Sequence, residues 1–137
     1  MTAEVFLDSN VLLYACSTAP ADAKKQAVAK RLILDSDFAL SAQVLQEFVA
    51  NALRKQALGI SESGIDAALE LSGHVPVLPI TRELVMSAVI LRRRFQLSHW
   101  DSIILAAVRA LGCHTLYTED LNHGQDYDGV RVINPFP

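Results

Sequence analysis

The sequence contains few of the residues that mark disulfide-rich, zinc-binding or disordered small proteins. Only two of its 137 residues are cysteine, and Cys16 and Cys113 lie far apart without Cys or His neighbours at zinc-ligand spacing. We therefore expect two free thiols that pack as small apolar side chains. Five prolines and six glycines are too few for a disordered or fibrous chain. The chain is expected to fold throughout.

Long apolar runs are also missing from the sequence. The longest, such as Ile103 to Val108, are much shorter than the roughly 20 residues that cross a bilayer. The start of the chain lacks the basic and then apolar segments of a secretory signal. We therefore expect a cytoplasmic protein that does not bind membranes.

Basic charge is not in excess either. The formal net charge of −3 argues against a protein that coats nucleic acid through charge alone. The run Arg92, Arg93 and Arg94 closes a predicted helix, where cations complement the helix dipole. A solvated helix end is the simpler interpretation of this run, and contact with nucleic-acid phosphates or with a partner is the alternative hypothesis.

The sequence does contain enough apolar residues for one packed domain. Hydrophobic residues make up 51% of the 137-residue chain. A chain of this length is one ordinary domain that buries roughly two-thirds of its unfolded surface. No internal repeat, low-complexity tract or linker interrupts it. Residues 1–137 are therefore predicted to form a single domain.

Short strand-like runs alternate with longer segments of helical periodicity. The predicted strands are Glu4–Leu7, Phe38–Leu40, Val75–Leu78, Thr115–Tyr117 and Arg131–Ile133. The predicted helices are Val11–Cys16, Asp22–Asp35, Ala42–Ala57, Glu62–Ser72, Arg82–Arg94 and His99–Leu111, and the N-caps of the last three are Ser61, Thr81 and Ser98. This alternation is typical of a parallel sheet with helices on both faces. Asp120–Gly129 is rich in turn-forming residues and is predicted to be an irregular surface loop.

Polar residues directly follow three of the predicted strands. Asp8 follows the first strand, Ser41 the second, and the run Thr118–Asp120 the fourth. The carboxyl ends of parallel strands share one edge of a sheet, where open α/β proteins bind their ligands. Asp101 lies in the first turn of a helix that is expected to point at the same edge. The pattern therefore places several acidic side chains at one site.

Each acidic residue also has a purely structural interpretation. Asp8 and Asp120 suit turns that follow a strand, and Asp101 fits the last position of a capping box. Glu47 lies with Gln43 on the polar side of its predicted helix, which by periodicity alone indicates a solvent-exposed face. Periodicity and spacing do not decide between these roles and a functional site.

Five segments in a fixed order resemble the PIN-domain ribonucleases, and most closely the VapC-type toxins of bacterial toxin-antitoxin modules. The segments are "FLDSNVLLYA", "SAQVLQEF", "HWDSIILAA", "GCHTLYTEDLNHGQ" and "VINPF". The resemblance covers the whole chain. It implies a PIN-like three-layer α/β/α sandwich with a central parallel sheet of about five strands. It also implies a toxin that is a metal-dependent endoribonuclease and leaves a 3′-hydroxyl and a 5′-phosphate.

The same resemblance assigns the site. The family's catalytic and metal-binding acids match Asp8, Glu47, Asp101 and Asp120, and its supporting polar residues match Asn10, Ser41 and Thr118. The implied cofactor is Mg²⁺ or Mn²⁺, and the implied partners are an RNA substrate, a cognate antitoxin protein and a second copy in a homodimer. The number of metal ions and the participation of Glu119 stay open.

A metal is also what elementary electrostatics requires at such a site. Carboxylates that converge repel one another, so a cation is needed between them. Mg²⁺ and Mn²⁺ are hard ions that take oxygen ligands, whereas a zinc site normally includes Cys or His. Such an ion activates a bound water and stabilises charge on a phosphate, which suits in-line hydrolysis of a phosphodiester.

Other functions stay open at this level. A metal-free ribonuclease would use general acid-base catalysis, for which the chain offers only the scattered His74, His99, His114 and His123. A phosphatase or a receiver domain would phosphorylate the strand-end Asp8, although such phosphatases have a second Asp where Asn10 stands. A PIN-like module without activity would only bind a partner.

Overall fold

The computed structural model describes residues 3–137, which form one mixed sheet flanked by helices. The strand order is β3-β2-β1-β4-β6-β5. The strands are β1 (Val5–Leu7), β2 (Phe38–Ser41), β3 (Val77–Leu78), β4 (Thr115–Tyr117), β5 (Asp126–Tyr127) and β6 (Val130–Ile133). All neighbouring strands run parallel except β5 and β6, which are antiparallel. The predicted five-stranded parallel sheet is confirmed, with one antiparallel strand added at its edge.

The added strand corrects one prediction, because β5 lies within the segment that was expected to be irregular. Asp128 and Gly129 both have positive φ, at 54° and 93°. Two such residues in succession form the tight turn that joins hairpin strands, so β5 folds back on β6. The side chain of Tyr127 is thereby buried. The pairing depends on this turn and on burial, and a two-residue strand has no periodicity of its own.

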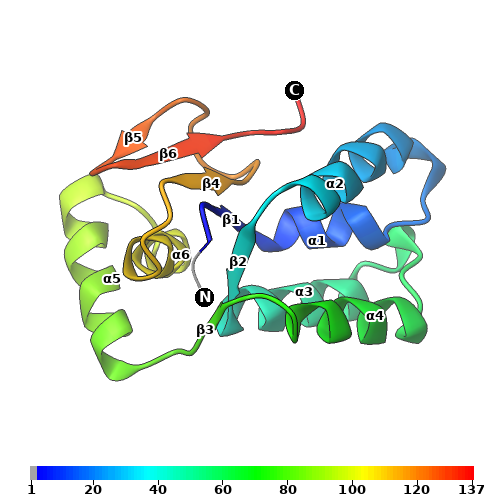
Figure 1. Cartoon of the computed structure of the whole chain (residues 1–137), viewed down its shortest axis with the longest axis horizontal. Helices are drawn as coiled ribbons and strands as arrows, with labels where there is room; N and C mark the ends of the chain where they lie inside the picture. Colours follow the sequence, from blue (N-terminus) through cyan, green and yellow to red (C-terminus); the bar gives the residue numbers. More distant parts are fainter. Residues whose placement is uncertain (1–2) are drawn as a thin grey trace.

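The helices lie on both sides of the strands, with α5 and α6 on one side and α1 to α4 on the other (Figure 1). They are α1 (Ser9–Cys16), α2 (Ala23–Asp35), α3 (Ala42–Arg54), α4 (Glu62–Ser72), α5 (Arg82–Phe95) and α6 (His99–Ala110), with short 3₁₀ turns at Pro20–Asp22 and Gln56–Leu58. This is the predicted three-layer architecture. Across residues 3–137, no helix combines the length and apolar character needed to span a membrane.

Caps and breaks set the helix boundaries. Ser61, Thr81 and Ser98 each accept a hydrogen bond from the backbone N–H three residues on, as predicted. Helix α1 begins at Ser9, two residues before the predicted start, because the Asp8 side chain caps it. Helix α3 ends at Arg54, and the rest of its predicted length is a separate 3₁₀ turn.

The core lies between the sheet and α1, α3 and α6. Phe6 and Leu7 of β1 and Leu116 of β4 are fully buried, since these strands occupy the centre of the sheet. Residues 102–108 of α6 are all buried, because this helix packs against α5 on one side and against β4 and β6 on the other. The rigid centre therefore fixes the ends of β1 and β4 and the start of α6, where the acidic residues lie.

Candidate active site

Asp8 lies at the centre of the candidate site, where β1 ends and α1 begins. Its backbone N–H donates to the carbonyl of Tyr117 at 3.0 Å, which ties it to the end of β4. One carboxylate oxygen, Oδ1, accepts from the N–H of Ser9 at 2.7 Å, and the other accepts from the hydroxyl of Thr118 at 2.8 Å. The residue is only 5% exposed. Asp8 is thus both a helix cap and a buried acid.

Burial raises the pKa of Asp8 to about 7. The hydrogen bonds from Thr118 and Ser9 lower this pKa, and the nearby charges of Glu47 and Asp120 raise it. Within residues 3–137, no Lys or Arg forms an ion pair with any of the four predicted site acids. A buried carboxylate with like charges around it and no paired cation is costly to ionise. A bound positive ion would stabilise the ionised carboxylate of Asp8.

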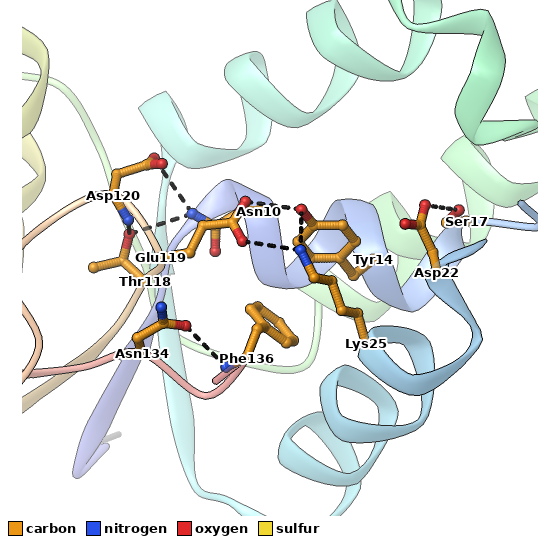
Figure 2. Close-up of polar contacts among 10 residues, drawn as sticks. All are labelled: Asn10, Tyr14, Ser17, Asp22, Lys25, Thr118, Glu119, Asp120, Asn134 and Phe136. Carbon is orange, nitrogen blue, oxygen red and sulfur yellow. Dashed lines mark hydrogen bonds and ion pairs between the residues drawn. The ribbon is translucent and has the colours of Figure 1, made fainter.

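Asn10 contacts both Thr118 and Asp120 (Figure 2). The Asn10 side-chain amide donates to the Thr118 hydroxyl at 3.2 Å and to Asp120 Oδ2 at 3.3 Å. Thr118 also accepts from the backbone N–H of Asp120 at 3.1 Å, so this threonine links Asp8, Asn10 and Asp120. The carbonyl oxygen of the Asn10 side chain is buried without a hydrogen-bond partner among the described residues. An oxygen of this kind is available to a cation.

Glu47 reaches the same region from α3. Its two carboxylate oxygens accept from the Ser9 hydroxyl at 3.2 Å and from the Gln43 amide at 2.7 Å. Gln43 is buried, so the solvent-exposed face that periodicity indicated for this side of α3 is wrong at that residue. Ser41 caps α3 by accepting from the N–H of Val44 at 3.2 Å, and it thereby positions the helix that carries Glu47.

Asp101 has a looser connection to the site. Its backbone N–H donates to the hydroxyl of the N-cap Ser98 at 3.1 Å. No hydrogen bond of its carboxylate is found among residues 3–137, so the reciprocal half of a capping box is not formed there. The pKa of Asp120 is raised first by burial and then by the charges of Glu119 and Asp101. Asp101 therefore lies within electrostatic reach of Asp120.

Glu119 is directed away from these acids. Its carboxylate accepts from the Tyr14 hydroxyl at 2.8 Å and lies 3.6 Å from the ammonium group of Lys25. Lys25 in turn donates to the Tyr14 hydroxyl and lies 4.5 Å from the centre of the Tyr14 ring. Figure 2 shows the three side chains grouped beside Phe136, on the α2 side of Asn10. Glu119 thus has a cation of its own.

Two residues of the network were not predicted, Ser9 and Gln43. Ser9 stands between two predicted site residues, and Gln43 precedes Glu47 by one helical turn on the same face. The positions of both residues can be read from the sequence. Their meaning depends on α1 and α3 packing together, which places the Ser9 hydroxyl against Glu47 across 38 residues of chain.

The positions of the arginine and histidine side chains bear on two alternative hypotheses, contact of the arginine run with a partner and metal-free catalysis by histidines. Arg94 pairs with Asp128 in the β5–β6 turn, while Arg92 and Arg93 are exposed. Among the histidines, His99 lines a pocket together with a site acid, Glu47. His74 and His114 precede β3 and β4, at the opposite ends of these strands from Asp8. His123 accepts a hydrogen bond from the backbone N–H of Asn134 at 3.0 Å, and no hydrogen bond joins two histidines in the described part of the chain.

The donor set fits a hard divalent ion that keeps part of its water shell. No three His, Cys, Asp or Glu side chains of residues 3–137 are grouped closely enough to hold a metal ion by themselves. Mg²⁺, however, is commonly bound through one or two carboxylates with several waters. The unpaired carboxylate of Asp8 and the free side-chain oxygen of Asn10 are hard oxygen donors on adjacent structural elements. Cys16 and Cys113 are free thiols outside this network.

The fold has counterparts among solved structures. A toxin-antitoxin complex from Klebsiella pneumoniae has a TM-score of 0.68 at 18% identity, over 97% of this chain and 98% of that one. The sarcin-ricin-loop-cleaving toxin VapC20 of Mycobacterium tuberculosis has a TM-score of 0.68 at 23% identity, over 85% and 90%. FitAcB from Neisseria gonorrhoeae has a TM-score of 0.65 at 21% identity, over 96% and 98%.

The sequence itself gives the decisive match. No curated protein matches the chain. The model of the PIN domain family, in contrast, matches residues 5–125, a range that includes all four predicted site acids. The resemblance to the PIN-domain family is confirmed by this match, and solved toxin-antitoxin proteins share the fold along most of the chain. On this match and this fold, the chain belongs to the PIN domain family.

Proposed function

We propose that this protein is a metal-dependent endoribonuclease and the toxin of a toxin-antitoxin module. The observation that carries the proposal is Asp8, a buried carboxylate at the end of the central strand that has no paired cation among the described residues. Support comes from the PIN domain match and from structures of similar fold, one of which is a toxin that cleaves the sarcin-ricin loop.

In this proposal Asp8 would hold the ion through its carboxylate, with the free amide oxygen of Asn10 in support, and Glu47, Asp101 and Asp120 would complete its surroundings. Mg²⁺ or Mn²⁺, when bound, supplies activation of water and stabilises negative charge on the phosphate. Thr118 keeps Asp8 in place by donating to Oδ2. Ser9 and Gln43 donate to the two oxygens of Glu47 and hold this carboxylate in place, so Glu47 would serve as the base that takes a proton from the attacking water. Attack on the phosphorus would break its bond to the 3′ oxygen, which would leave as a 3′-hydroxyl after taking a proton from solvent.

We further infer that the protein acts in the cytoplasm, that it forms a homodimer and that a cognate antitoxin inhibits it. The homodimer and the location follow from the family resemblance. Support for the antitoxin comes from the solved relatives in fold, which include a toxin-antitoxin complex from Klebsiella pneumoniae and a DNA-bound VapBC from Salmonella typhimurium.

The test is cleavage of a labelled single-stranded RNA by purified protein that has been freed of antitoxin. Cleavage is expected with Mg²⁺ or Mn²⁺ and is expected to stop in EDTA. Asp66→Asn is a matched control, because Asp66 is exposed on α4 and outside the carboxylate network. Equal cleavage in EDTA would contradict the metal mechanism, and a phosphorylated Asp8 would favour a phosphatase or receiver instead.

A further inference from the structure

A groove of about 570 Å³ lies next to the carboxylate network, between α3, the start of α5 and the start of α6. Gln43 and Glu47 belong to its wall and also to the hydrogen-bond network of the site. Gln43 additionally reaches the carbonyl of Trp100 at 3.4 Å, so it connects the two regions. The groove therefore opens where the proposed chemistry takes place.

Trp100 is the most unusual side chain of this groove. It is 65% exposed although Trp is usually largely buried, and it directly precedes Asp101. Its ring meets the His99 ring edge-on, with the centres 5.1 Å apart. Most of this large, rigid aromatic side chain is thus open to solvent beside the acidic site. Aromatic faces of this kind stack with nucleobases.

The charge of the residues that line the groove favours a neutral ligand over an anionic one. The residues that line it, all within the described chain, include no Lys or Arg, and Glu47 contributes a negative charge. A phosphate would be repelled there, whereas a nucleobase is neutral. Gln43, Gln46 and His99 offer hydrogen-bond donors and acceptors around an otherwise apolar lining. An apolar cleft with a few polar side chains is typical of sites that bind flat small groups.

We propose that this groove binds one unpaired RNA base beside the cleaved phosphate, with the base stacked on Trp100. The inference rests on the proposed ribonuclease function and names a residue that selects the substrate. A base can enter the groove only when it is unpaired and turned out of a helix. The groove would therefore restrict cleavage to single-stranded or looped RNA.

Trp100 is the only tryptophan in the chain, so its fluorescence reports directly on the groove. The experiment titrates the protein with a short single-stranded RNA, both in EDTA and as the inactive Asp8→Asn variant in Mg²⁺. Saturable quenching is expected in at least one condition. An RNA of the same length without bases should not quench, because a sugar-phosphate chain cannot stack.

Affinity measured by anisotropy of labelled RNA completes the test. Trp100→Ala is expected to bind about 5- to 100-fold more weakly, and Trp100→Phe should stay within a few-fold of the wild type. Ile90→Ala is the matched control, since Ile90 is equally exposed at 65% but lies outside the groove. Its affinity should not change.

Three results would overturn the inference. Equal binding of normal and base-free RNA, together with unchanged affinity of Trp100→Ala, would show that no base enters the groove. A Trp100→Ala variant that turns a dimer into a monomer, with fluorescence that follows protein concentration and not RNA, would assign the groove to a second copy. Failure to bind either RNA, both by the folded wild type in EDTA and by the folded Asp8→Asn variant in Mg²⁺, would contradict the ribonuclease function itself.

Discussion

Two consecutive acids at the end of β4, Glu119 and Asp120, lie in opposite electrostatic environments. Glu119 belongs to a balanced cluster with Tyr14 and Lys25, in which a hydroxyl and an ammonium group offset its charge. Asp120 belongs to an unbalanced cluster with Asp8, Glu47 and Asp101, in which the described residues supply no ion pair. Position at a strand end is therefore not enough to assign a catalytic acid. An ion pair separates the two clusters, because Lys25 pairs with Glu119, whereas Lys55 lowers the pKa of Asp120 through its charge without pairing with it.

The largest expected difference between the clusters is in catalysis. Asp8→Asn removes a carboxylate from the unbalanced cluster and should lower RNA cleavage on the order of 1,000-fold, as expected for loss of a group that stabilises transition-state charge. Glu119→Gln should change the rate by no more than a few-fold. Single-turnover cleavage in Mn²⁺ measures both. A similar loss in the two variants would place Glu119 in the site.

The second difference concerns the stability of the metal-free protein as a function of pH. Burial raises the pKa of Asp8 to about 7 from an ordinary value of 3.8, so the folded state favours the protonated acid. The contribution of Asp8 to stability is then greatest below about pH 4 and decreases as the pH rises through 7. The full loss from Asp8 is at most about 4 kcal/mol, since each pKa unit corresponds to about 1.4 kcal/mol.

Urea unfolding in EDTA between pH 4 and pH 8 measures this effect. The wild type should lose stability as the pH rises, and Asp8→Asn should lose much less, because an amide does not titrate. Saturating Mn²⁺ should restore the stability of the wild type at pH 7. Parallel pH profiles of the two proteins would mean that the buried carboxylate of Asp8 is stabilised by something other than a missing cation.

A third comparison asks whether Asp101 belongs to the unbalanced cluster or only stabilises the first turn of α6 through the helix dipole. An ion that binds only the folded state stabilises it by about 2.7 kcal/mol at a hundredfold excess over Kd. Asp101→Asn should lose most of this increment in Mn²⁺. In EDTA the variant should be as stable as the wild type or more so, since Asp101 repels Asp120.

Thermal unfolding at low salt, with Mn²⁺ and with EDTA, separates the two roles of Asp101. Loss of an acid from the first turn of a helix normally costs a few tenths to about 1 kcal/mol. A variant that is destabilised in EDTA but gains as much from Mn²⁺ as the wild type does would show that Asp101 only stabilises the first turn of α6.

Much of the fold could be predicted because it depends on local patterns. The alternation of strands and helices predicted a parallel sheet. The residues Ser61, Thr81 and Ser98 were predicted as N-caps, and they begin three helices as expected. Strand β5 was missed because two residues carry no period, and the strand exists through its turn and its pairing with β6. Elements that depend on tertiary pairing leave little trace in the sequence.

The site was predictable to a different degree at each residue. The strand-end position indicated Asp8 and Asp120, but only the family resemblance selected Glu47, because periodicity placed it on a solvated face. The contacts that define the two clusters cross long separations, such as 110 residues between Thr118 and Asp8 and 105 between Tyr14 and Glu119. Whether the charge of an acid is offset by a cation depends on how α1 and α2 pack together. A local sequence pattern does not predict this packing.

The smallest expected effect comes from the balanced cluster, where Lys25→Met removes the cation. The Lys25 side chain is 41% exposed, and an exposed ion pair contributes about 0–1 kcal/mol. The free energy of unfolding should therefore fall by less than about 1 kcal/mol, and by even less at high salt. Lys24→Met is the control, since it makes the same change of charge at an exposed neighbour.

The informative measurement on Lys25→Met is the stabilisation by Mn²⁺. If the clusters are independent, this increment should match that of the wild type and of Lys24→Met, because Tyr14 still donates to Glu119. If Lys25→Met alone changes the increment, a Glu119 released from its cation has moved towards Asp120 and takes part in ion binding. That outcome would mean that Lys25 determines how many acids bind the metal. Whether Glu119 belongs to the balanced or to the unbalanced cluster would then depend on this one side chain.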